Sequence, residues 1–140
     1  MSKVYLALPY SPDHLLGHVS EDGKILCSQA GFDDVIGYVN LGTGEVYEQR
    51  FGPDKKVGHV DPGSGKVYVS RLGPDKYIGI VKADGSLHRH VPMAADDYVG
   101  KVERFVSYAH SAGAFLLLVL PALEARRQED PSNQADESAA

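Results

Sequence analysis

The feature that most limits what this chain can fold into is a short repeat, in which a glycine between branched apolar residues recurs every 20 or 21 residues. The five copies are Leu16-Gly17-His18-Val19, Ile36-Gly37-Tyr38-Val39, Val57-Gly58-His59-Val60, Ile78-Gly79-Ile80-Val81 and Val99-Gly100-Lys101-Val102. An aspartate precedes each glycine at one spacing; these residues are Asp13, Asp33, Asp54, Asp75 and Asp96. A fixed period of this length predicts an architecture built from one small repeated unit.

Each repeat unit has the pattern of a β-hairpin. A glycine-containing turn follows each of the first four copies, and a second apolar run follows the turn, centred on Ile25-Leu26, Val46-Tyr47, Val67-Tyr68 and Leu87-His88. Two short runs rich in Val, Ile and Tyr on either side of such a turn are typical of a hairpin. The period is too short for a crossover helix, so the strands must pair antiparallel. The sequence therefore predicts an all-β fold of five pseudo-repeated hairpins.

The two ends of the repeat region complement each other. The segment Lys3-Val4-Tyr5-Leu6 matches a second strand, Lys66-Val67-Tyr68-Val69, and has no first strand before it, whereas the fifth first strand, 98–102, has no second strand after it. Pairing of these two would close a ring or barrel with pseudo-fivefold symmetry and without free edges. An open row of hairpins is the alternative. We expect residues 1–102 to form this β domain, 103–127 a C-terminal helix, and 128–140 a disordered acidic tail.

Alternation along the strands divides their side chains between two faces. The repeated glycines share a face with Val19, Val39, Val60, Val81 and Val102, and we assign that face to the interior. Their recurrence predicts either a close backbone approach or a backbone angle that only glycine adopts. The apolar residues before them, Leu16, Ile36, Val57, Ile78 and Val99, fall on the other face. A sheet that is apolar on both sides needs a cover, and the C-terminal segment is the candidate.

That segment, residues 105–123, contains no Asp, Glu, Lys or Arg over 19 residues. Its length is at the lower limit for crossing a bilayer as a helix, but His110, Gly113 and Pro121 weaken that interpretation. Three interpretations stay open: a helix that packs on the β domain or plugs its mouth, a single membrane span, and an oligomerising helix. We expect a cytoplasmic protein, with membrane association through residues 105–123 as the alternative.

Charge and cysteine content exclude two classes. Cys27 is the single cysteine, so a disulfide scaffold is ruled out. The net charge is -5, with 14 Lys and Arg against 19 Asp and Glu, and the basic residues form no large cluster, which argues against nucleic-acid binding.

The outward face of the predicted sheet also carries aromatic and histidine side chains that could stack on a ligand or partner. The candidate binding residues are Tyr5, His18, Tyr38, Tyr47, His59, Tyr68, His88 and His90. His88 and His90 stand two positions apart on one strand, so they are also weak candidates for metal ligands. The alternative is that the tyrosines simply pack under the C-terminal helix.

Catalytic signatures are missing from the sequence. It contains no Gly-x-Ser-x-Gly elbow, no His-Glu-x-x-His helix and no phosphate-binding glycine cluster. We therefore expect no enzyme and no cofactor. The expected function is a non-catalytic protein-interaction or scaffold module, which binds a protein partner or itself and is soluble or tethered by its helix. The alternative is a small-molecule or metal-binding protein that uses the His/Tyr face.

The pattern Tyr77-x-Gly79-x-Val81-x-x-x-Gly85 resembles the MORN repeat, a single glycine-punctuated hairpin of slightly longer period. No copy here has the paired Gly-x-Gly second strand of that family, and Val stands where its aromatic residue would be. The resemblance implies a scaffold or partner-binding role and carries over no individual residue.

Overall fold

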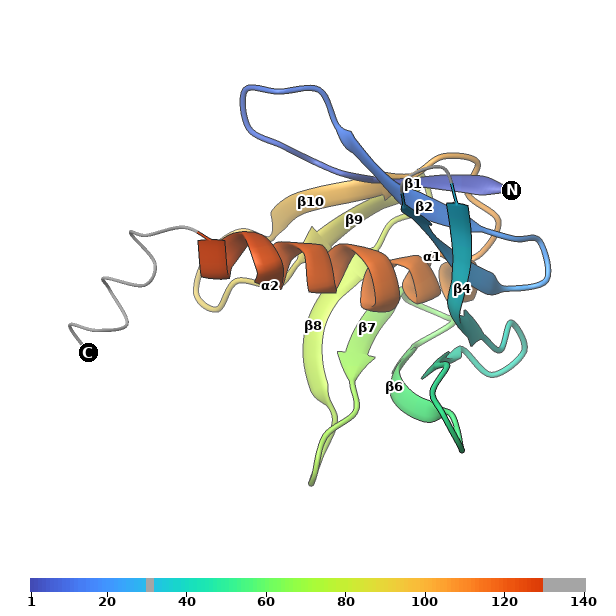
Figure 1. The fold of residues 1–140 in the computed structure, drawn as a ribbon. Coiled ribbons are helices and arrows are strands. Elements are labelled where there is room, and N and C mark those ends of the chain that lie inside the picture. Colours follow the sequence, from blue (N-terminus) through green and yellow to red (C-terminus); the bar gives the residue numbers. More distant parts are fainter. Residues whose placement is uncertain (30–31, 130–140) are drawn as a thin grey trace.

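The computed structural model describes residues 1–29 and 32–129, which form a closed antiparallel barrel of ten strands and one C-terminal helical segment (Figure 1). The strands are β1 (Ser2–Leu6), β2 (His14–Val19), β3 (Lys24–Gln29), β4 (Phe32–Val39), β5 (Glu45–Glu48), β6 (Lys55–Val60), β7 (Lys66–Val69), β8 (Lys76–Val81), β9 (Ser86–Arg89) and β10 (Asp97–Val102). The helical segment consists of α1 (Tyr108–Ala114), a π-helical turn η1 (Phe115–Val119) and α2 (Leu120–Glu129). The predicted all-β fold of repeated hairpins with one C-terminal helix is confirmed. The predicted tail lies outside the described residues from position 130 onward.

The barrel closes where the sequence predicts. Strand β1 pairs antiparallel with β10, and Tyr5 lies directly opposite Lys101. Every other strand pairs with its neighbours in chain order, so the ladder runs around the barrel without an edge. The alternative of an open row of hairpins is therefore wrong.

The same β-bulge occurs once in each repeat, where a first strand pairs with the second strand of the preceding unit. The pairing register shifts by one residue at the position before each glycine, so the residue at that position has no direct partner on this neighbouring strand. The five residues are Leu16, Ile36, Val57, Ile78 and Val99. A bulge redirects a side chain that strict alternation would place on the other face. These five residues pack with the buried core. The expectation that they form an apolar outer face in need of a cover was therefore wrong.

The repeated glycine is explained by the other edge of the same strand, where the pairing is regular. A Cβ on Gly58 would collide with the carbonyl oxygen of Tyr68 on the partner strand, and the carbonyl of the cross-strand residue blocks the equivalent Cβ in the other four copies. None of these glycines has a positive φ. Of the two expected reasons for glycine, close backbone approach is correct and special backbone angles are not.

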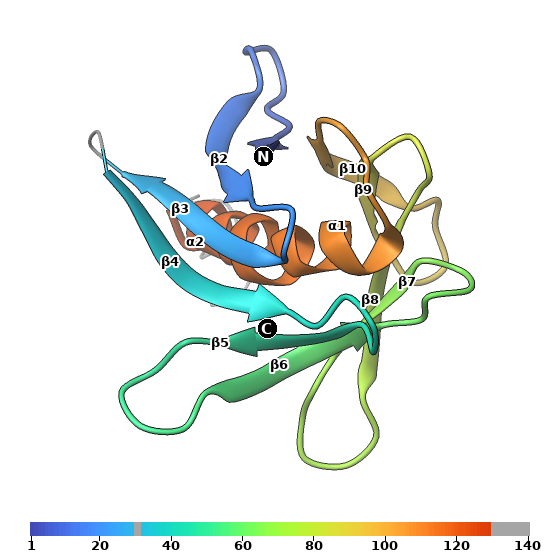
Figure 2. The same ribbon diagram turned by 90° about the vertical axis from the view of Figure 1, so that its right-hand side faces the viewer.

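The C-terminal helix runs through the inside of the barrel, as the view in Figure 2 shows. Every residue from Ala109 to Val119 is buried, so this part of the helical segment is surrounded on all sides by protein. The predicted helix is present, but it packs against the Gly/Val face rather than covering the outer face. Residues Tyr108–Arg126 are long and apolar enough to cross a membrane by length and composition, and 61% of that stretch is buried in the barrel.

The π-helical turn matches the helix to the barrel. Three consecutive residues face glycines of three consecutive repeats: Phe115 lies over Gly79, Leu116 over Gly58 and Leu117 over Gly37. Five copies around a closed barrel are on average about one fifth of a turn apart, which is less than the rotation of about 100° per residue in an α-helix. A π-helix, with its i→i+5 bonds, rotates less per residue and so follows the repeats more closely. Pro121, which has no N–H to donate, follows this turn.

We predict that Gly58→Ala strongly destabilises the barrel. The added methyl group would meet the Tyr68 carbonyl and lie 2.8 Å from Leu116 Cδ1, so strand and helix would both have to move. The free energy of unfolding, measured in urea, should fall by about 3 kcal/mol or more. The control is Gly63→Ala in the next turn, where a Cβ would meet only Asp61 Oδ1 at 3.6 Å. Equal stability of the two variants would contradict the close-approach explanation.

Candidate functional site

The predicted aromatic and histidine residues lie on the outer wall of the barrel, and the longest run of them crosses β6 to β9. His59 stacks on Tyr68 with ring centroids 4.9 Å apart, and Tyr68 contacts Tyr77 at 5.7 Å. Tyr77 in turn contacts His90 at 4.8 Å. The helix is inside the barrel, so the alternative that the tyrosines pack beneath it was wrong. Cross-strand contacts of this kind stabilise a sheet, and they leave the outer edges of the rings facing solvent.

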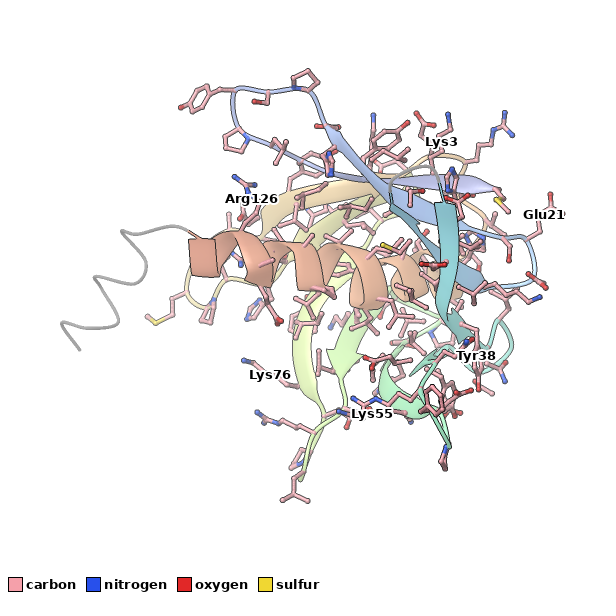
Figure 3. The ribbon with its side chains drawn as sticks, viewed as in Figure 1. Lys3, Glu21, Tyr38, Lys55, Lys76 and Arg126 are labelled. Atoms are coloured by element: carbon pink, nitrogen blue, oxygen red, sulfur yellow. The ribbon has the colours of Figure 1, made fainter. Side chains whose placement is uncertain are left out.

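The other candidates are separate from this run. Tyr38 stacks on Tyr47 at 5.2 Å and lies on the outside of the barrel (Figure 3). His88 contacts Tyr98 at 5.6 Å, and the ammonium of Lys101 lies 5.4 Å from the Tyr5 ring. His18 Nδ1 is 3.3 Å from Ser28 Oγ. The eight residues therefore form several groups around the wall rather than one site.

Four of the five repeated aspartates contact a side chain of the preceding repeat. Each of three first-strand side chains meets the aspartate of the next repeat: His18 Nδ1 lies 3.8 Å from Asp33 Oδ2, His59 Nδ1 3.0 Å from Asp75 Oδ2, and Lys101 Nζ 3.9 Å from Asp13 Oδ2. The Lys101 contact crosses the point of closure. His90 Nδ1 lies 3.5 Å from the last aspartate, Asp96. These carboxylates therefore make lateral contacts between repeats, which their regular spacing in the sequence does not reveal.

The tyrosine pair on β4 and β5 has a polar surround. The Tyr47 hydroxyl donates to Glu45 Oε2 over 3.0 Å, and Lys56 Nζ lies 3.2 Å from the same oxygen. The hydrogen bond to Glu45 raises the pKa of Tyr47, and partial desolvation together with Asp54 raises the pKa of Tyr38. The contacts of Lys56 and Tyr47 lower the pKa of Glu45. Both tyrosines are thus neutral hydrogen-bonding groups at neutral pH.

The weak metal candidates, His88 and His90, are engaged by different partners. His88 Nε2 lies 3.1 Å from Ser86 Oγ, and His90 faces Asp96 and Tyr77. In the described part of the chain, no group of three or more His, Cys, Asp or Glu side chains could hold a metal ion. The arrangement gives no support to a zinc-type site, which needs at least three protein ligands.

One histidine lies inside the barrel. His110 is 1% exposed, and its Nε2 lies 2.9 Å from the carbonyl oxygen of Ser20. That partner can only accept, so Nε2 carries the hydrogen, and Nδ1 has no partner among the described residues. Burial lowers the pKa of His110, an effect opposed by the Ser20 carbonyl and reinforced by the N-terminal ammonium.

The loops at one end of the barrel hold a set of exposed residues that the alternation along the strands does not reveal. Four large apolar side chains stand fully exposed at the tips of these loops: Tyr10, Phe51, Leu72 and Met93. Each lies three residues before a repeated aspartate, and this spacing is a signal that the sequence offered. The fifth equivalent position, 30, lies outside the described residues.

The exposed tips and the outer end of the helix share one end of the barrel. The short turns lie at the opposite end of the barrel. There Gly65 approaches Tyr108, the first residue of α1, and Gly85 approaches Phe105, which lies just before α1. Lys76, Arg89 and His90, which flank the long loops, border a cavity with Leu123 and Glu124 of α2. Figure 3 shows Arg126 at the outer end of α2. The long-loop end therefore combines apolar tips with an emerging, charged helix.

We predict that acid destabilises the barrel through His110. The pKa of this group is lowered in the folded state, so the unfolded chain binds a proton more readily as pH falls below the ordinary value of 6.5. Each unit of pKa depression corresponds to about 1.4 kcal/mol of stability, lost progressively down to the folded-state pKa. Urea unfolding at pH 7.5 and 5.5 should show the loss in the wild type and a smaller one in His110→Gln. A parallel pH dependence in both proteins would contradict this role.

Comparison of the chain with protein-family models, with curated proteins and with solved structures finds no match, so the likeness to MORN repeats stays one of construction.

Proposed function

We propose that this protein is a non-catalytic binding module that docks a protein partner through the loops at the helix-exit end of the barrel. The observation that carries the proposal is the pair of loops between β5 and β6 and between β7 and β8. Their tips, Phe51 and Leu72, are fully exposed. An arginine precedes each tip, Arg50 in one loop and Arg71 in the other.

The two loops have the same local design. A glycine with positive φ follows each tip, Gly52 at 86° and Gly73 at 91°, and the sequence Pro-Asp-Lys follows each glycine. Figure 2 shows both loops reaching outward from the barrel. The design repeats the same anchor in two successive loops of the barrel. Aromatic residues and arginine are enriched in protein interfaces.

The chemistry of these loops indicates a partner with apolar pockets and an acidic rim. Arg50 Nε donates to Glu48 Oε1 over 2.9 Å, and Arg71 Nε donates to the carbonyl oxygen of Pro74 over 2.8 Å. These bonds hold each arginine beside its apolar tip. Lys55 and Lys76 begin the strands that follow and add positive charge.

A bilayer is a poorer fit to this end of the molecule. Helix α2 leaves the barrel here, and Glu124 and Arg126 on it are exposed. A membrane lying against all the loop tips would have to accept these charges, which is costly. A protein partner can engage two neighbouring loops and leave the helix in water.

The filled barrel gives these loops a fixed base. The helix occupies the interior with Phe115 and Val119 completely buried, so the strands that carry the loops pack on a solid core. Anchors on a rigid scaffold lose less conformational entropy on binding. The absence of catalysis and the cytoplasmic location remain predictions.

We predict that a photo-reactive phenylalanine analogue at position 51 or 72 crosslinks one protein partner in cells. The same analogue at position 41, an exposed leucine in a short turn at the opposite end, is the matched control. The adduct should be identified by mass spectrometry and should disappear in the Arg50→Glu plus Arg71→Glu variant, because an acidic rim would repel the new charges.

Three outcomes would contradict the proposal. They are the lack of any adduct at positions 51 and 72, equal adducts at positions 51 and 41, and an adduct of twice the chain mass. The last result would make the partner a second copy of this chain.

A further inference from the structure

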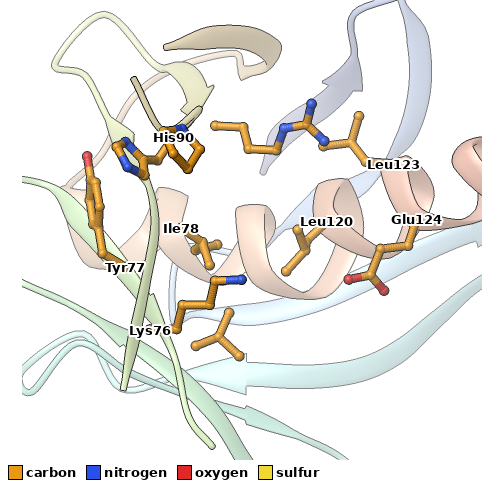
Figure 4. A pocket seen from close by; sticks show the side chains of 10 residues that line it. Lys76, Tyr77, Ile78, His90, Leu120, Leu123 and Glu124 are labelled. Atoms are coloured by element: carbon orange, nitrogen blue, oxygen red, sulfur yellow. The ribbon is translucent and has the colours of Figure 1, made fainter. Parts of the chain in front are cut away.

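A cavity of about 350 Å³ opens where α2 leaves the barrel, between this helix and strands β7 to β9 (Figure 4). Its volume falls in the range of pockets that bind small molecules, about 300–1,000 Å³. The cavity is distinct from the loop tips, since neither Phe51 nor Leu72 borders it. Lys76 belongs both to the cavity and to the positive surround of the docking loops, but the rest of the cavity takes no part in the proposed docking, so the cavity is a candidate site for a separate ligand.

The floor of the cavity is apolar. Ile78 contributes from β8, and Leu120 and Leu123 contribute from α2. All three are partly buried and pack with the core, so each keeps some apolar surface toward the cavity. Ile78 is the extra residue of a bulge, and Leu120 directly follows the π-helical turn. Bulges and π-helical turns occur frequently beside functional sites.

The rim of the cavity carries charge from three residues. Lys76 stands at the start of β8, and Glu124 lies on α2 across the opening (Figure 4). Arg89 stands at the end of β9 and also borders the cavity. Arg89 Nη2 lies 3.5 Å from Asp97 Oδ2. The Lys76 ammonium makes no ion pair or hydrogen bond with any residue of 1–29 or 32–129. A cation without a partner above an apolar floor is the arrangement that an amphipathic anion requires.

We propose that this cavity binds a small amphipathic carboxylate. The apolar body of the ligand lies against Ile78, Leu120 and Leu123, and its carboxylate accepts hydrogen bonds from the Lys76 ammonium, with the Arg89 guanidinium beside it. Glu124 limits the affinity, because it is a like charge at the same opening. The site selects an anion with an apolar chain over a neutral or cationic molecule of the same length.

The test is a titration of the full chain with sodium octanoate, followed by NMR of the backbone amides, with octylamine and octanol as matched probes. Octanoate should shift the amides of residues 76–78 and 120–124 saturably, and it should bind at least about tenfold more tightly than either other probe.

Two variants report on the charges. Lys76→Met should weaken octanoate binding about tenfold, and Glu124→Gln should tighten it. The control is Lys66→Met, which removes an exposed lysine from the start of the neighbouring strand β7, outside the cavity.

Several results would overturn the proposal. They are the lack of a saturable shift, shifts spread over the whole barrel, octylamine binding as tight as that of octanoate, and equal effects of Lys76→Met and Lys66→Met. Ile78→Ser gives a further check, because the loss of apolar surface should weaken the binding of octanoate and of octanol alike. Unchanged binding of octanoate would show that Ile78 is not part of the site.

Discussion

The close approach of each repeated glycine to the carbonyl of the opposing strand is the constraint on which the rest of this structure depends. With any side chain at these positions, the strand could not lie so close to the partner on the edge opposite the bulge, and this condition recurs five times around the barrel. The bulge turns the preceding apolar residue toward the core, and the bare glycine leaves room for the helix. The repeated glycine thus allows close pairing of the strands and also makes space for the helix inside the barrel.

In the interior, a helix packs against β-strands, and the side chains of these two elements repeat with different periods. Small side chains on α1, such as Ala112 and Gly113, allow the helix to approach the wall closely near its start. Larger side chains follow in the π-helical turn, where Phe115, Leu116 and Leu117 lie over glycines. Small side chains on one element therefore face larger ones on the other, as the dense packing of a core requires.

The sequence repeat was sufficient to predict the hairpins, the antiparallel pairing and the closure that places Tyr5 opposite Lys101. It could not predict the position of the helix, because strict alternation assigns Ile78 and its equivalents to the outer face and only the bulge reverses that assignment. The sequence also could not predict the side-chain contacts between neighbouring repeats. The pairing of His59 with Asp75 depends on the lateral distance between neighbouring units, which a comparison of copies does not contain. The exposed tips were missed for another reason, since alternation along strands says nothing about loops.

The order of elements along the chain has a consequence for biosynthesis. The ten strands are synthesised before residues 108–119, which supply the centre of their hydrophobic core. Hairpins that emerge from the ribosome would have one another to pair with but nothing to close around, and their Gly/Val faces would stay accessible. A nascent chain of this design should therefore depend on chaperones or on rapid completion of synthesis, and the barrel should reach its native state only once its last segment is available.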